Sequence, residues 1–157
     1  MGGESLTLVL SDRKEHLKAI YESLPAFVQK QTRISTGDLK VAERNENLQL
    51  VREGKIRILF ATQLGDEGLD IPALSNLVLT FPGKSSIKVI QRLGRIQRVV
   101  QGKRSARCYD IVDHEMSLLR HQYAQRHKIY KTQGFRVKNP ILGKRIKSVV
   151  AYSQEAS

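Results

Sequence analysis

Short apolar runs alternate with amphipathic segments along the chain. The run from Leu6 to Leu10 predicts a buried strand. A helix should follow it, because apolar residues recur three and four positions apart and so share one helix face. These residues are Leu17, Ile20, Tyr21 and Leu24. Asp12, with Glu15 three residues later, suggests a capping box at the start of this helix, and Pro25 should end it.

The same alternation continues through most of the chain. It predicts strands at 32–35, 56–61, 77–80 and 106–112, and helices at 39–53, 85–100 and 114–132. Gly54, Gly102 and Gly134 follow these helices, where a helix C-terminus favours glycine. In the second of these helices the residues expected to point inward are Ile87, Ile90, Leu93 and Ile96.

Strands that alternate with helices predict an α/β fold, a doubly wound parallel sheet with helices on its faces. Ligands of such sheets bind outside the carboxyl ends of the strands. The loops that follow the strands should therefore carry the chemistry. They are 11–13, 36–38, 62–72, 81–86 and 113–115.

The 157 residues fit one domain, and 40% hydrophobic with 27% charged residues is a globular composition. No apolar run reaches the roughly 18 residues that cross a bilayer, and the first residues have no apolar signal core. We therefore expect no membrane partner and a cytoplasmic location, the host cytoplasm if the protein is viral. Cys108 is the single cysteine and should be a buried small hydrophobe. No metal site is expected, because the four histidines are scattered.

The charge points to a polyanionic partner. The chain has 27 Lys and Arg against 15 Asp and Glu, a net charge of +12, and neutralising phosphates releases counterions. Between Glu115 and Glu155 there is no acid but nine basic residues. We expect residues 135–157 to form a basic extension that is loosely held or docks on a partner. A solvated basic face is the alternative.

One predicted helix gathers cations on a single face. Gln91, Arg95 and Arg98 stand at positions i, i+4 and i+7. Two guanidinium groups aimed at one place repel each other unless an anion joins them. Gly94 inside the helix costs about 1 kcal/mol relative to alanine, so a close neighbour such as a phosphate would explain it. The alternative is a solvated basic helix.

Four segments resemble the motifs of superfamily 2 helicases of the DEAD/DEAH type, in the family's order. Residues 91–98 resemble motif VI, 61–72 motif V, 8–12 motif IV, and Thr36-Gly37 with Arg44 the intervening nucleic-acid-binding motif. The chain thus resembles the C-terminal RecA-like domain of such a helicase, over about residues 5–115. The spacing of Leu118, Gln122, Arg126, Tyr130 and Gly134-Phe135 is similar to that in bacterial and phage DNA helicases of the repair type.

The resemblance implies a shared ATP site. ATP with Mg²⁺ would be bound mainly by a first RecA-like domain, and Arg95 and Arg98 would reach its γ-phosphate as arginine fingers. Gln91 would contact the same region. Gly68 and Asp70 match nucleotide-binding positions, and Asp70 could instead be a turn-making acid before Pro72.

The resemblance also implies contacts with nucleic acid. Thr36, Gly37 and Thr62 match positions that hold backbone phosphates, which fix position without reading sequence. Thr62 could instead cap its strand. Arg44 belongs to the same motif, and Lys84 has a small chance of a phosphate contact. We favour DNA over RNA, from the tail alone.

The expected domains are leader residues 1–4, a RecA-like domain at 5–134 and the extension at 135–157. Gly83-Lys84-Ser85 is no Walker A loop, because Val78 stands where its first glycine belongs. Without that loop or an acidic motif II, the isolated chain should bind ATP weakly and hardly hydrolyse it. We interpret it as an excised C-terminal half, or a truncated gene product that acts with a partner chain. The alternatives are a non-enzymatic nucleic-acid-binding module and an unrelated nucleotide-binding protein.

Overall fold

The computed structural model describes residues 6–62, 74–81, 87–88, 90–91, 106–113, 115–142 and 147–154. The elements are β1 (Leu6–Ser11), α1 (Lys14–Ser23), α2 (Ala26–Gln29), β2 (Thr32–Ser35), α3 (Val41–Arg52), β3 (Ile58–Ala61), β4 (Leu74–Phe81), β5 (Ala106–Asp113), α5 (Ser117–Thr132), β6 (Arg136–Leu142) and β7 (Lys147–Gln154). Residues 87, 88, 90 and 91 are also helical. Strands and helices largely alternate up to α5, as the apolar pattern predicts, although α2 follows α1 directly.

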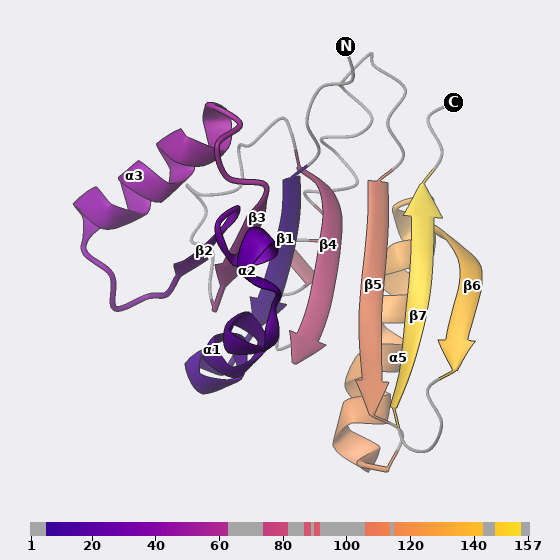
Figure 1. The fold of residues 1–157 in the computed structure, drawn as a ribbon. Coiled ribbons are helices and arrows are strands. Elements are labelled where there is room, and N and C mark those ends of the chain that lie inside the picture. The colour runs from indigo at the N-terminus through magenta and orange to yellow at the C-terminus, as the bar shows by residue number, and fades with distance from the viewer. Residues whose placement is uncertain are drawn as a thin grey trace.

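The strands form one sheet in the order β2-β3-β1-β4-β5-β7-β6 (Figure 1). The first five strands in this order are parallel. β7 runs antiparallel to β5, and β6 runs antiparallel to β7. The predicted α/β class, a parallel sheet flanked by helices, is therefore confirmed. The parallel strands end at one edge of the sheet, the carboxyl edge, at the bottom of Figure 1.

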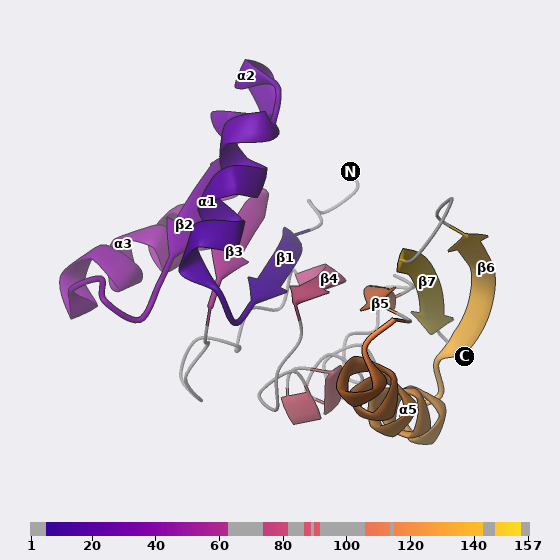
Figure 2. The same ribbon diagram turned by 90° about the horizontal axis from the view of Figure 1, so that it is seen from below.

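Alternate residues of the parallel strands pack into two apolar clusters, one on each face of the sheet (Figure 2). Leu8 and Leu10 pack in the cluster to which α3 and α5 contribute. Val9, between them, packs on the other face with α1. All four residues predicted for the buried face of α1 lie in that second cluster, which confirms the helical spacing.

The predicted capping residues of the helices agree with the structure at some helix ends and not at others. The predicted capping box at Asp12 is wrong, because α1 begins after Arg13 and has no side-chain cap. The amide of Lys40 at the start of α3 instead donates to Glu43, at 3.0 Å. Gly54 and Gly134 adopt φ of 71° and 82°, as glycines after helices do. Gly102 lies outside the described residues.

The described part of the C-terminal extension, β6 and β7, is paired in the sheet, so the prediction of a loosely held segment is wrong for these residues. β7 pairs with β5 along its whole length, from Ala106 opposite Gln154 to Asp113 opposite Lys147. The sequence could not predict this pairing, because the basic composition of the segment does not indicate a strand. Its partner strand also lies far away along the chain and leaves little local signal. The domain boundaries themselves stay predictions.

A buried ion pair joins β5 to α5. Asp110 accepts two hydrogen bonds from the Arg126 guanidinium, at 2.8 and 2.9 Å, and one from the Tyr130 hydroxyl at 2.9 Å. All three residues are buried, and Tyr130 stacks on Tyr152 of β7 with ring centroids 3.9 Å apart. This arrangement holds helix, central sheet and C-terminal strand together.

The remaining observations concern the single cysteine, metal-binding side chains and membrane-spanning helices. Cys108 is fully buried as predicted, and burial raises the pKa of its thiol well above the usual value. Within the described ranges no cluster of His, Cys, Asp or Glu could hold a metal ion. No helix in the described part of the chain is long and apolar enough to span a membrane.

Candidate nucleic-acid interface

β2 and β3 end at the same level of the carboxyl edge, and β1, beside β3, continues one residue further to Ser11. Ser35 of β2 and Leu10 of β1 are both in register with Ala61 of β3. The residues that follow Ser35 and Ala61 are Thr36 and Thr62, on strands that lie roughly 5 Å apart. The sheet therefore brings together two of the predicted phosphate contacts from sequence positions 26 residues apart.

Thr36 is 5% exposed, and its hydroxyl donates to Asp38 Oδ1. The other carboxylate oxygen of Asp38 accepts from the ammonium of Lys14, at the start of α1. Asp38 and Lys14 are both exposed. The carboxylate of Asp38 thus links the loop after β2 to the start of α1. It accepts one hydrogen bond from Thr36 in that loop and one from Lys14 of the helix.

Asp38 is charged under all ordinary conditions. The hydrogen bond from Lys14, followed by that from Thr36, lowers the pKa of this carboxyl to about 2. The same contact with Asp38 raises the pKa of Lys14. An anion and a cation therefore stand permanently at this edge of the sheet.

Gly37 and Arg44 offer the most open surface of the predicted contacts. Gly37 is exposed, and a Cβ added there would meet nothing within 4 Å. A ligand can therefore approach its backbone. Arg44 is exposed in the first turn of α3, and Thr62 is half-buried. Gly37 lies in the loop after β2, and Arg44 lies on α3, the helix to which this loop leads.

The nucleotide-binding predictions fall mainly outside the described residues. This holds for Arg95, Arg98, Gly68 and Asp70, and Lys84 of the predicted nucleic-acid contacts also lies outside them. Gln91 is described: it is helical and half-buried, and it follows the fully buried Ile90. Ile87 is half-buried, so the start of this helix has the predicted inward face.

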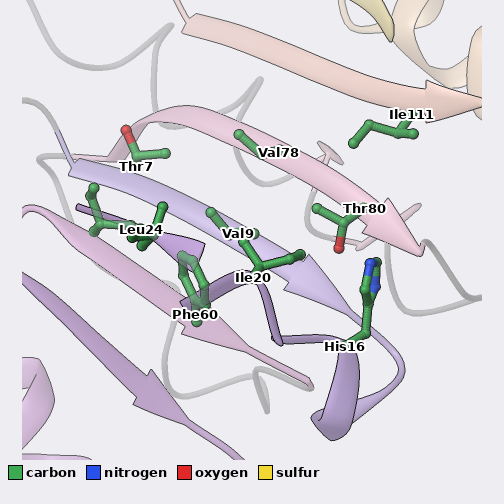
Figure 3. A pocket seen from close by; sticks show the side chains of 10 residues that line it. Thr7, Val9, His16, Ile20, Leu24, Phe60, Val78, Thr80 and Ile111 are labelled. Carbon is green, nitrogen blue, oxygen red and sulfur yellow. The ribbon is translucent and has the colours of Figure 1, made fainter. Parts of the chain in front are cut away.

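A cavity of about 520 Å³ lies between α1 and the sheet (Figure 3). Its lining is largely apolar and includes Val9, Ile20 and Phe60. His16 and Thr80 stand together at one end, where His16 also lies 3.2 Å from the Ser11 hydroxyl. A phosphate site needs several converging donors, so this cavity is unsuited to a nucleotide's charged end.

Comparison with known protein families shows to which family the domain with this edge belongs. Residues 2–100 match the model of the helicase conserved C-terminal domain, which is more than half of the chain. The chain belongs to the helicase C-terminal domain family. The match includes the ends of β1 to β4 and residues 91–98, and it confirms the resemblance that the motifs indicated.

Individual relatives agree with the family. "Putative helicase 22" of Sulfolobus islandicus filamentous virus (isolate Iceland/Hveragerdi) is 47% identical over 73 residues, 46% of this chain and 13% of that protein. "Probable ATP-dependent RNA helicase ddx42" of Dictyostelium discoideum is 39% identical over 62 residues, 40% of this chain and 6% of that protein. The chain thus spans a small part of these relatives.

One solved structure shares the fold of this chain. The solution structure of the carboxyl-terminal domain of Dbp5p superposes with a TM-score of 0.54 at 20% identity. The match covers 82% of this chain and 68% of that one. At this identity the likeness supports the RecA-like fold alone.

Two groups of this helicase C-terminal domain were missed by sequence reasoning. Lys14 and Asp38 had no assigned role, although Asp38 directly follows the Thr36-Gly37 pair. Asp110 has no role in the sequence predictions above, and Arg126 is one of the nine basic residues between Glu115 and Glu155. Both pairings join residues far apart in the sequence, so only the three-dimensional arrangement shows them.

Proposed function

We propose that this chain is the second motor domain of an ATP-dependent helicase or translocase. The observation that carries the proposal is the register of β2 and β3, which brings Thr36 and Thr62 to one level of the carboxyl edge. Hydroxyl and amide donors gathered there suit the phosphates of a nucleic-acid backbone. Such contacts carry no sequence information, so binding should tolerate any sequence and weaken steeply with salt.

The nucleotide half of the proposal depends on Arg95 and Arg98. The family match includes both arginines. Gln91, the first residue of segment 91–98, is helical and follows Ile90, whose side chain is buried. ATP with Mg²⁺ would be bound mainly by a first RecA-like domain of the same or a partner chain. The two arginines would stabilise charge that develops on the transferred phosphoryl group, and this chain alone would hydrolyse ATP hardly at all.

We expect coupling between the two sites because the predicted nucleotide residues Gly68 and Asp70 follow Thr62 closely in the sequence. When the arginines are drawn to ATP, the cleft between the two domains closes, and reopening follows hydrolysis. The loop after β3 begins at Thr62, so it connects the nucleic-acid contact to the predicted nucleotide residues Gly68 and Asp70. Alternate closing and opening would move the grip on the backbone.

The nucleic-acid half is tested by binding of labelled single-stranded DNA and RNA. Arg44→Ala should weaken binding and lower the slope of log affinity against log salt by roughly 0.7, as for one lost phosphate contact. Arg52→Ala is a matched control, since Arg52 is also exposed but ends α3. Equal effects of the two substitutions would mean that the chain binds through overall charge. Comparing DNA with RNA tests the preference for DNA.

The ATPase half is tested in a polypeptide that joins this chain to a first RecA-like domain. Arg98→Ala should lower the nucleic-acid-stimulated kcat by about 10³-fold or more, because an arginine finger is worth that much. The exposed Arg107 on β5 provides the control substitution to alanine. A kcat unchanged by Arg98→Ala would make the chain a non-enzymatic nucleic-acid-binding module that kept the fold.

A further inference from the structure

The ion pair between Lys14 and Asp38 crosses the end of a strand. Lys14 follows β1 and Asp38 follows β2, while β3 lies between these two strands in the sheet. β3 ends at Ala61, immediately before Thr62. The pair therefore lies at the same edge of the sheet as Thr36 and Thr62, the residues that follow β2 and β3.

The carboxylate of Asp38 is bonded as a phosphate would be. One of its oxygens accepts from the Thr36 hydroxyl and the other from the Lys14 ammonium. A phosphodiester group has two such oxygens with one shared negative charge, and hydroxyl and ammonium donors are what protein sites use to bind it. Asp38 and a backbone phosphate would thus compete for the same two donors.

We propose that Asp38 takes the place of a nucleic-acid phosphate in the free protein, and that Lys14 is a further phosphate-binding residue which Asp38 holds until nucleic acid displaces it. This inference rests on the proposed function, because it presumes that the carboxyl edge binds a nucleic-acid backbone. It adds a residue from α1 to a site otherwise formed by the ends of β2 and β3.

The pair is suited to exchange. The side chains of Lys14 and Asp38 are 56% and 59% exposed, so water screens their attraction and little is lost when they separate. The low pKa of Asp38 keeps it charged, so a phosphate displaces a carboxylate and no protonation is required. Asp38 then remains beside the bound backbone and weakens binding by repulsion.

The test is anisotropy of a fluorescein-labelled single-stranded oligothymidylate, titrated with the 157-residue chain over a series of salt concentrations. The variants are Asp38→Asn, Lys14→Met and the double variant. Glu22→Gln is the matched control, because it also removes one negative charge from an exposed ion pair, that of Lys18 and Glu22 on α1.

Asp38→Asn should tighten binding about three- to fivefold, which is the scale of one exposed ion pair, and more than Glu22→Gln does. Lys14→Met should lower the log–log salt slope by roughly 0.7, the value for one phosphate on a single strand. The loss of affinity caused by Lys14→Met should be larger in the Asp38→Asn background, because there Lys14 is free before binding.

Two results would overturn the inference: an unchanged salt slope for Lys14→Met, or equal gains for Asp38→Asn and Glu22→Gln. Arg44→Ala, measured in the same series, separates this failure from failure of the proposed function. If Arg44→Ala weakens binding while Lys14→Met does not, the edge binds nucleic acid without Lys14. If neither substitution changes the slope, both proposals fail.

Discussion

Two ion pairs of a carboxylate with a basic side chain differ in their exposure to water. One lies at the carboxyl edge of the sheet, and the other lies between the sheet and α5. Lys14 and Asp38 meet in water at the carboxyl edge, with side chains more than half exposed. Arg126 and Asp110 meet in the interior between α5 and β5, where their side chains are 4% and 0% exposed. The first pair joins the loop after β2 to the start of α1, and the second joins α5 to the sheet.

The difference lies in what happens when a partner is lost. At the exposed edge, water or a phosphate can replace either member, so the pair is weak and exchangeable. In the interior nothing replaces the lost partner, and the remaining charge stays buried. The same kind of contact therefore serves binding in one region and assembly of the fold in the other.

The largest effect that would test this contrast is that of Arg126→Met. It should lower the free energy of unfolding by about 3–5 kcal/mol, because Asp110 is left buried without its cation. Urea unfolding followed by circular dichroism measures this change. Lys14→Met, at the exposed pair, should lower the free energy of unfolding only slightly, because water replaces the lost partner, and similar losses for both variants would remove the distinction.

A smaller effect is expected for Tyr130→Phe. The ring can still stack on Tyr152, but Asp110 loses the hydroxyl that donates to it at 2.9 Å. The free energy of unfolding should fall by about 1–2 kcal/mol, the cost of a missing hydrogen bond to a buried carboxylate. Tyr21→Phe on α1 is the control, and a loss as large there would point to a general effect of the hydroxyl.

The smallest effect concerns pH at the exposed pair. The pKa of Asp38 is lowered to about 2 in the folded protein, so its contribution to stability is present above the ordinary pKa near 3.8 and is lost as the pH falls towards 2. Carboxyl NMR should show this titration. In Lys14→Met the pKa should rise towards 3.8, and a wild-type value already near 3.8 would contradict the pairing.

The local pattern of apolar and polar residues was sufficient to predict the central strands of the sheet. The bounds of β2, Thr32–Ser35, agree with the prediction because a short apolar and β-branched run ends at Thr36-Gly37. β3 begins at Ile58 instead of Ile56, although Ile56 is buried like a strand residue. Apolar periodicity reports burial, and burial extends beyond the hydrogen-bonded strand.

What depends on long-range pairing could not be predicted. The Lys14–Asp38 contact requires that β3 lies between β1 and β2, and no local pattern gives the order of strands. Arg126 stands in a basic segment, so its burial depends on an acid in a strand sixteen residues earlier. The predicted phosphate contacts Thr36 and Thr62 were named from the resemblance, and the register of the sheet supplies their proximity.

The pairing of β7 with β5 has a practical consequence for anyone who shortens this protein. The family match ends at residue 100 and α5 ends at Thr132, so a shortened chain that ends directly after α5 is an obvious choice. Such a fragment would leave the outer backbone amides and carbonyls of β5 without their partners and would uncover the Tyr130 ring. Open strand edges recruit one another, so the shortened protein should precipitate or form oligomers that the full chain avoids.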